Sequence, residues 1–226
     1  MAVIIGAQGG IGAALLQAGR SHWLFDRVCG YGRSTPVALD LLDESSIAAT
    51  AAAISHAQLP VSLIIDATGV LAADGCRAEK ALRELDPSAM ARAFAINAIG
   101  PALLLKHLLP LLPKDRPSLF ASLSARVGSI GDNQLGGWYS YRASKAALNQ
   151  LLHTAAIELR RTRPAAICVA IHPGTVDTPL SAPFAKTGLD VQTPGHAAQQ
   201  LLTTLSSLDL THSGTFVDQH GRTIPW

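Results

Sequence analysis

The chain has 226 residues, of which 48% are hydrophobic and 15% charged, with a formal net charge of +2. A chain of this length and composition is expected to bury a sizeable core as one domain over residues 1–226. The near-neutral charge, without a long basic run, argues against a nucleic-acid or membrane partner. The longest apolar stretch, 101–112, is interrupted by Lys106, His107 and Pro110 and is too short to span a bilayer.

The cysteines bear on the compartment. Cys29, Cys76 and Cys168 are odd in number and lie in or near apolar segments. This pattern predicts reduced, buried thiols of a cytoplasmic protein, with neither a disulfide framework nor a metal site. Met1 leads directly into the first predicted strand, so we expect no signal peptide.

Predicted strands and helices alternate along the chain. The strands are 2–6, 27–31, 61–66, 117–123, 166–172 and 214–218, and the helices are 10–20, 43–57, 87–111, 138–162 and 194–206. The segment 66–86 is harder to assign, with a further short helix expected around 77–84. Such alternation predicts an α/β fold, a single doubly wound Rossmann domain whose mostly parallel sheet has helices on both faces. Ligands of such sheets bind beyond the carboxyl ends of the strands.

The first predicted strand ends in a glycine-rich turn that leads into a helix. Glycines permit a tight turn and a close approach of the backbone, and the helix N-terminus offers unpaired N–H groups to a pyrophosphate. The turn therefore predicts a dinucleotide site, with cofactor-binding residues Gly6, Gln8, Gly9, Gly10, Ile11 and Gly12. The alternative is a flexible turn without a ligand.

The second predicted strand is followed by Arg33 and Ser34, with no acidic residue until Asp40. An acidic residue here would bind the adenosine ribose of NAD, whereas a guanidinium and a hydroxyl suit the 2′-phosphate of NADP. We therefore expect NADPH to be favoured over NADH. The alternative is that Arg33 is an ordinary surface residue of a loop.

Tyr141 and Lys145 lie one turn apart on a predicted helix and so can address the same small volume. A neighbouring ammonium is expected to lower the pKa of a phenol, which is ordinarily about 10. Tyr141 is thus a candidate general acid and base, assisted by Lys145. Alone, such a pair is as often a solvated helix face.

The spacing Gly6-x-x-x-Gly10-x-Gly12, followed far downstream by Tyr141-x-x-x-Lys145, resembles the short-chain dehydrogenase/reductase family over essentially the whole chain. The resemblance implies hydride transfer between a nicotinamide cofactor and a small carbonyl or alcohol substrate. Segments 128–130, 136–138 and 221–226 are similar to a carbonyl-reductase subgroup that includes the C-factor and sniffer proteins.

The resemblance also implies roles for cofactor-contacting residues. Asp40 and Leu41 correspond to positions beside the adenine ring, and Ala67, Thr68 and Gly69 to backbone against the central ribose. The family usually has Asn-Asn-Ala-Gly where this chain has Asp66-Ala67-Thr68-Gly69, so both amides are missing. The nicotinamide is expected against a later segment, with contacts from Pro173, Gly174, Val176 and Thr178.

The remaining catalytic positions follow from the same resemblance. Asn97 is expected to hold a distortion of its helix and a water that relays protons to Lys145. The usual catalytic serine aligns with Ala125, which leaves Ser124 at the strand end and Ser129, twelve residues before Tyr141, as candidates. Spacing favours Ser129, although one or both serines can be ordinary turn residues.

Substrate and partner expectations are less specific. The segment 180–193 is the expected substrate lid, and its Leu180, Phe184 and Leu189 suggest an apolar substrate face. His172 is expected to be a packed core-edge residue, and helices 87–111 and 138–162 to pair copies into a homodimer or homotetramer. Ala125 and the Asp66-Ala67 pair leave open an alternative function, an NADPH-binding regulatory or signalling protein with vestigial catalysis.

Overall fold

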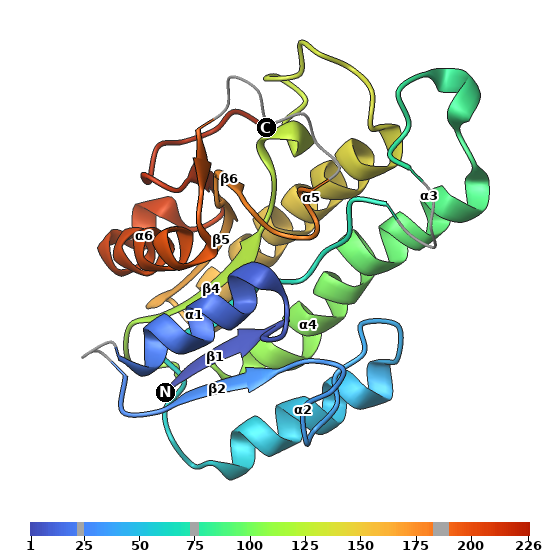
Figure 1. Cartoon of the computed structure of the whole chain (residues 1–226). Coiled ribbons are helices and arrows are strands. Elements are labelled where there is room, and N and C mark those ends of the chain that lie inside the picture. Colours follow the sequence, from blue (N-terminus) through green and yellow to red (C-terminus); the bar gives the residue numbers. More distant parts are fainter. Residues whose placement is uncertain (22–24, 73–76, 183–189) are drawn as a thin grey trace.

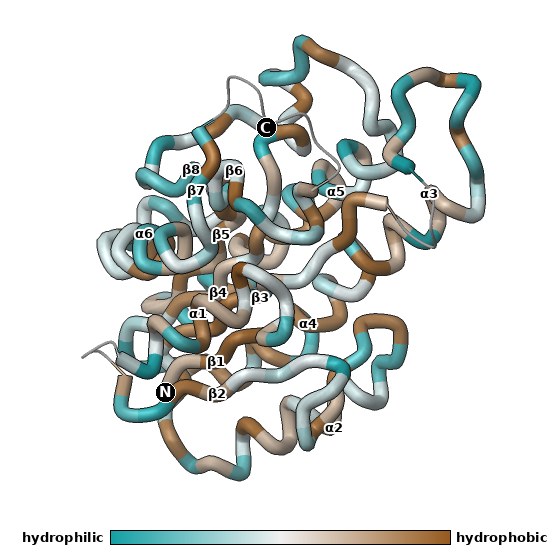
Figure 2. The backbone as a smooth tube through the Cα atoms, in the orientation of Figure 1, coloured by the Kyte–Doolittle hydropathy of each residue, from teal (hydrophilic) through white to brown (hydrophobic). Residues whose placement is uncertain are grey.

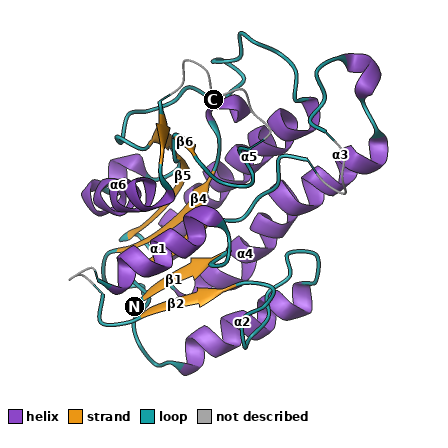
Figure 3. Cartoon of the chain, in the orientation of Figure 1, coloured by secondary structure: helices purple, strands orange, loops and turns teal. Residues whose placement is uncertain are grey.

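The computed structural model describes residues 1–21, 25–72, 77–182 and 190–226. Its centre is a six-stranded parallel sheet in the order β2-β1-β3-β4-β5-β8 (Figures 1 and 3). The strands are β1 Ala2–Ile5, β2 Val28–Tyr31, β3 Leu63–Asp66, β4 Ser118–Leu123, β5 Ala166–His172 and β8 Phe216–Asp218. The order reverses between β1 and β3, which is the point where doubly wound sheets bind ligands.

Helices cover both faces of this sheet (Figure 1), so the predicted α/β fold is confirmed. On one side lie α1 and α6, and on the other α2, α4 and α5. The helices are α1 Gly10–Arg20, α2 Glu44–His56, α3 Pro87–Phe94, α4 Gly100–Leu108, α5 Tyr139–Thr162 and α6 Pro194–Ser207.

Buried apolar side chains form a core on each face because strand residues alternate in direction. In β1, Val3 and Ile5 pack with α2, α4 and α5, whereas Ala2 and Ile4 pack with α1 and α6. All four residues of β1 are buried, and Figure 2 shows this strand in the hydrophobic colour. A strand enclosed on both faces explains its uninterrupted apolar sequence.

The predicted helix 87–111 is interrupted. A π-helical segment, Ala95–Ile99, separates α3 from α4, and a 3₁₀ turn, Leu109–Leu111, ends the run. Pro101 contributes to the irregularity because it has no N–H to donate to the preceding turn. The run is long and apolar enough to cross a membrane, a test that core helices also pass, and here it packs against α2 and α5.

Other elements differ slightly from their predicted bounds. The helix expected around 77–84 is only a 3₁₀ turn, Leu82–Glu84, and β3 starts two residues later than predicted. A small second sheet pairs β6, Thr175–Val176, with β7, Val191–Gln192, and was not predicted. Strands of two residues are too short to produce a recognisable alternation.

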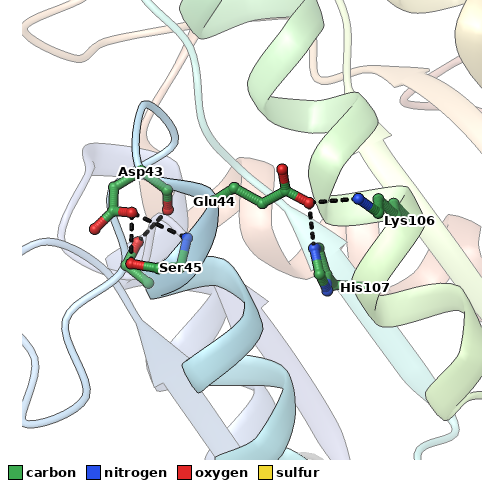
Figure 4. A network of polar contacts seen from close by, with 6 residues as sticks. Asp43, Glu44, Ser45, Lys106 and His107 are labelled. Carbon is green, nitrogen blue, oxygen red and sulfur yellow. Dashed lines mark hydrogen bonds and ion pairs between the residues drawn. The ribbon is translucent and has the colours of Figure 1, made fainter.

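A polar cluster on the surface joins α2 to α4 (Figure 4). The carboxylate of Glu44 accepts hydrogen bonds from Lys106 Nζ at 2.6 Å and His107 Nε2 at 2.8 Å. These bonds, the one from Lys106 first, hold the pKa of Glu44 below its usual range. Beside it, Asp43 caps α2 by accepting a bond from the Ser45 N–H.

Candidate active site

The glycine turn after β1 is built so that α1 starts directly against the strand end. Gly6 has φ of +77°, and a Cβ on Gly12 would lie only 2.1 Å from the Gly6 carbonyl oxygen. Only glycine fits at position 12 without displacing the turn. No side chain in the described part of the chain caps the start of α1, so its N–H groups remain available to an anion.

A cavity of about 340 Å³ opens beyond the carboxyl ends of β1, β2 and β3, within the usual range for ligand sites. Predicted cofactor residues that line it are Gly6, Gln8, Gly9, Arg33, Asp40, Leu41, Ala67, Thr68 and Gly69. This lining, together with the turn before α1, fits the adenosine half and pyrophosphate of a dinucleotide. The remaining predicted cofactor residues are not on the cavity wall.

Sequence reasoning missed other residues of the cavity wall: Gly32, Leu39, Leu42, Val70, Arg92 and Ile96. Arg92 and Ile96 precede Asn97 in the helical run and are four residues apart, so they share a face of that helix. That spacing was the available signal. Arg92 places a second guanidinium on the wall, in addition to Arg33.

Gln8 links the glycine turn to the loop after β2. Its side-chain oxygen accepts a hydrogen bond from the Ser34 N–H at 3.0 Å, and both Arg33 and Ser34 are exposed. The backbone of the predicted phosphate-binding loop is thereby fixed to the turn before α1.

The predicted nicotinamide segment approaches the same turn from the other side. A Cβ on Gly10 would lie 2.6 Å from Thr178 Cγ2, so the two residues are in direct contact. Gly174 has φ of +78°, and Gln192 Nε2 donates to the Pro173 carbonyl at 2.8 Å. Val176 is buried. The structure thus brings Gly10 and Thr178 together although they lie far apart in the sequence.

Tyr141 and Lys145 lie in the first two turns of α5 and are both buried. Lys145 Nζ donates to the Leu123 carbonyl at 2.8 Å. Burial lowers the pKa of Lys145 to about 8, an effect partly offset by the charge of Asp66. Burial raises the pKa of Tyr141, so the expected downward shift is wrong for this structure.

Asn97 lies in the π-helical segment, and this confirms the expected helical distortion. Its side-chain oxygen accepts from the Val70 N–H at 2.9 Å, and its Nδ2 donates to the Val70 carbonyl at 2.8 Å and to Ser144 Oγ at 3.1 Å. Ser144 Oγ in turn donates to the Tyr141 carbonyl at 2.9 Å. Asn97 therefore joins the loop after β3 to the turn of α5 that carries Tyr141.

Gly69 is where Asn97 and Lys145 meet. A Cβ built on Gly69 would lie 3.3 Å from both Asn97 Oδ1 and Lys145 Nζ. The amide, the ammonium and the loop backbone consequently share one small volume at the edge of the nucleotide cavity.

Comparison with known proteins agrees with this geometry. The family model described as short chain dehydrogenase matches residues 24–188. The C-signal protein of Myxococcus xanthus is 34% identical over 168 residues, which cover 74% of this chain and 93% of that protein. The chain belongs to the short-chain dehydrogenase family.

Solved structures with this fold include the carbonyl reductase Sniffer of D. melanogaster, with a TM-score of 0.87 at 21% identity, covering 100% of this chain and 98% of that one. The NADPH-bound carbonyl reductase from chicken fatty liver has a TM-score of 0.84 at 25% identity, with the same coverage of both chains. This short-chain dehydrogenase is accordingly an NAD(P)-dependent oxidoreductase that acts on small molecules. Within the family it is similar to the subgroup that includes the C-factor and sniffer proteins.

This short-chain dehydrogenase departs from the family pattern at the end of β3. Asp66 is 1% exposed and accepts hydrogen bonds from the Thr68 N–H at 3.0 Å, Thr68 Oγ1 at 2.6 Å and Ser122 Oγ at 2.7 Å. The two bonds from Thr68 cap the turn after β3. The bond to Ser122 on the neighbouring strand could not be read from local sequence.

The segment after β4 also differs from the family pattern, and both candidate serines donate hydrogen bonds to other groups of the protein. Ser124 Oγ donates to Asn149 Oδ1 at 2.6 Å. Ser129 Oγ donates to the Pro225 carbonyl at 2.5 Å and accepts from the Asp132 N–H at 3.0 Å. Both serines are buried, and Ala125 between them has no polar side-chain atom. Their catalytic role stays a prediction.

Glu79 is a residue that sequence reasoning missed. Its buried carboxylate accepts hydrogen bonds from the hydroxyl and the N–H of Ser140, and its carbonyl accepts from the Trp138 N–H. Trp138 adopts a left-handed conformation with φ of +51°, immediately before α5. Glu79 therefore fixes the start of the helix that carries Tyr141. It lies in the segment 66–86, which no local pattern resolved.

Some predicted residues lie outside the described part of the chain: Cys76 and, in the expected lid, Phe184 and Leu189. Cys29 and Cys168 are free thiols, and burial raises the pKa of Cys168 to about 12. His172 is partly buried at the end of β5, and burial, followed by the nearby Arg126, lowers its pKa to about 4. That low pKa suits a packed histidine.

Proposed function

We propose that this protein reduces a small carbonyl compound with NADPH, and that Tyr141 donates the proton. The observation that carries the proposal is that Lys145 Nζ and the Asn97 amide both lie beside Gly69, at the edge of the nucleotide cavity, with Lys145 one helical turn from Tyr141. The bound nicotinamide would supply the hydride.

Each residue has a separate task in this proposal. Burial keeps the Tyr141 phenol protonated near neutral pH, so the hydroxyl carries the proton that the substrate oxygen would receive. Lys145 Nζ donates to the Leu123 carbonyl and lies beside Gly69, one helical turn from Tyr141, and its proposed task is to supply charge and protons to that phenol. Asn97 holds the loop backbone at Val70 and connects to the Tyr141 turn through Ser144.

We propose that Tyr141 holds the substrate oxygen without a serine partner in this arrangement. Ser124 and Ser129 each donate their hydroxyl to a protein acceptor, and either bond would have to break before that serine could reach a substrate. Ser129 remains the candidate favoured by spacing if such a change occurs.

The experiment follows NADPH absorbance over a panel of aldehydes, ketones and quinones. Replacing Tyr141→Phe should lower turnover by about 10²–10⁴-fold, the range for a positioned acid. Tyr139→Phe is the matched control, because it removes a hydroxyl from the same turn of α5. Equal turnover by the Tyr141 variant and the wild type would refute the proton-donor role.

The preference for NADPH over NADH is proposed to come from Arg33, which lines the cavity beyond β2. Arg33→Ala should weaken NADPH binding by about 10–100-fold, the value of a hydrogen bond to a charged group, and leave NADH binding nearly unchanged. Isothermal titration with both cofactors measures this. Equal losses for the two cofactors would contradict the assignment.

The alternative function is an NADPH-binding regulatory or signalling protein with vestigial catalysis. Ala125 and the engaged serines favour it, as does the similarity to a protein named C-signal. Tight NADPH binding with no turnover on any carbonyl of the panel would select this alternative.

We also propose that copies pair through the helical run 87–111 and α5 in the cytoplasm. Exposed apolar side chains occur on both: Ile99 on the first, and Leu151 and Ile157 on the second. Light scattering after size-exclusion chromatography would give the mass, and a mass of one chain at micromolar concentration would reject the pairing.

A further inference from the structure

We infer that Asp66 is a positioning residue whose negative charge keeps the buried Lys145 in its ammonium form during turnover. This inference rests on the proposed function, since it concerns the lysine that serves Tyr141. It would explain why this chain has an aspartate at position 66, where the family usually has an asparagine.

The carboxylate of Asp66 is held in one arrangement. It lies at the last residue of β3 and is 1% exposed. Thr68 donates two hydrogen bonds to one of its oxygens, and Ser122 donates one to the other. Every bond in this set is donated to Asp66, as an ionised carboxylate requires, because that form only accepts.

The partners of Asp66 are the immediate neighbours of the groups that touch Lys145. Thr68 precedes Gly69, and a Cβ built on Gly69 would lie 3.3 Å from Lys145 Nζ. Ser122 pairs with Asp66 across the β3–β4 ladder and precedes Leu123, whose carbonyl accepts from Lys145 Nζ at 2.8 Å. The carboxylate and the ammonium are thereby bound to the same two segments, one residue apart on each.

The other elements around Lys145 bring little charge to it. Asn97 from the π-helical segment is neutral, and Tyr141 on α5 keeps its proton because burial raises its pKa. Arg126, from the turn after β4, is 46% exposed in its side chain and pairs with Asp132 and Asp218. Among the described residues, Asp66 is the buried anion whose charge reaches Lys145.

A buried ammonium needs such a counter-charge. At 3% exposure Lys145 has lost most of its hydration, and this favours its neutral form. An asparagine would keep the shape of the Asp66 site but not its charge. The carboxylate consequently extends the pH range over which Lys145 stays charged toward higher pH.

The test is Asp66→Asn, which preserves side-chain shape and can still bond to Thr68 and Ser122. The first readout is a ¹⁵N NMR titration of lysine Nζ in the full chain without substrate. The chain has five lysines, so the spectrum is simple, and the Lys145 signal is assigned by its loss in Lys145→Met. The titration midpoint of Lys145 should fall by about one pH unit or more.

The second readout is the pH profile of kcat/KM for carbonyl reduction. In Asp66→Asn the basic limb of this profile should move to lower pH by the same number of pH units as the Lys145 midpoint. Ser122→Ala is the matched control, because it removes one bond to Asp66 and leaves the charge; its titration midpoint and basic limb should move less than those of Asp66→Asn. Thermal melts check that both variants are folded.

The outcomes separate this inference from the proposed function. An unchanged Lys145 midpoint in folded Asp66→Asn overturns the inference, whether or not the wild type turns over. A lowered midpoint in a protein that reduces no carbonyl supports the charge coupling and rejects the proposed reaction. A midpoint lowered equally by Ser122→Ala also overturns the inference, because the charge would then not be the cause.

Discussion

The ends of β3 and β4 are neighbours in the sheet, yet they use their polar residues in different ways. At β3, Asp66 is buried, accepts hydrogen bonds from Thr68 and Ser122, and offsets part of the lowering of the Lys145 pKa by burial. At β4, Ser124 donates its hydroxyl to Asn149, and the side chain of Ala125 has no hydrogen-bond donor for a substrate. In the proposed mechanism, proton supply at β3 and substrate polarisation at β4 have therefore diverged separately. The end of β3 has an aspartate where the family usually has an asparagine, while the serine hydroxyls after β4 donate to other groups of the protein.

Among the tests of this contrast, the largest expected change comes from adding the missing hydroxyl at β4. Ala125→Ser should raise kcat/KM for carbonyl reduction by about tenfold or more, since one donor to a developing oxyanion is worth 10²–10³-fold in a fully arranged site. Steady-state kinetics with the best carbonyl of the panel measures this. The same gain in the Ala125→Gly control would show that the hydroxyl is not responsible.

Removing the existing hydroxyls is the next test of the contrast. Ser129→Ala should lower the free energy of unfolding by about 1–3 kcal/mol, because it leaves the Pro225 carbonyl and the Asp132 N–H without this partner. Urea unfolding measures the loss, and kcat/KM should change less than threefold. Ser124→Ala serves as the parallel variant. A hundredfold loss of kcat/KM in either folded variant would identify that serine as the substrate's donor and break the comparison.

His172 extends the comparison to the neighbouring strand β5, where burial keeps an ionisable group neutral. Its pKa is lowered from 6.5 to about 4, so as pH falls between these values the unfolded chain takes up a proton that the folded protein refuses. The free energy of unfolding should therefore fall with decreasing pH in this window, by up to about 1.4 kcal/mol per pH unit. Urea unfolding of wild type and His172→Gln measures it. The slope should shrink in this variant and persist in His56→Gln, an exposed histidine.

The smallest expected effect concerns the surface cluster of Figure 4. Glu44→Gln removes an ion pair with Lys106 and His107 that is open to solvent. Surface pairs contribute little and are screened by salt. The unfolding midpoint should stay within measurement error at 0.5 M salt, and a clear loss there would mean that exposure is a poor guide to the worth of an ionic contact.

Local patterns predicted most of the fold and part of the site. Alternating apolar segments gave the order of strands and helices, and the glycine spacing matched a turn that a Cβ on Gly12 would destroy. The cavity lining agrees with much of the predicted adenosine site, from Gly6 to Gly69. These features depend on residues close together in the sequence, so their spacing carries the information.

Contacts between distant segments could not be predicted. Glu79 meets Ser140, and Asp66 meets Ser122, only because the sheet and α5 bring these segments together. The predicted direction of the Tyr141 pKa shift was wrong for a related reason. The sequence shows a lysine one turn away, but it does not show how deeply the phenol is buried. Likewise Ser129 has a suitable spacing, but its bond to Pro225 depends on a residue near the other end of the chain.

The π-helical segment Ala95–Ile99 makes residue number, more than residue identity, a constraint on this site. A π-helical bulge holds one residue more than the α-helical turn it replaces, and each α-helical residue turns the chain by about 100°. Deleting one residue here would restore a regular helical turn and leave α3 and α4 in nearly the same relative orientation, because the bulge holds the extra residue. Asn97 would then point in a different direction and lose its bonds to Val70. Length changes in this segment should therefore be harder to accommodate than substitutions.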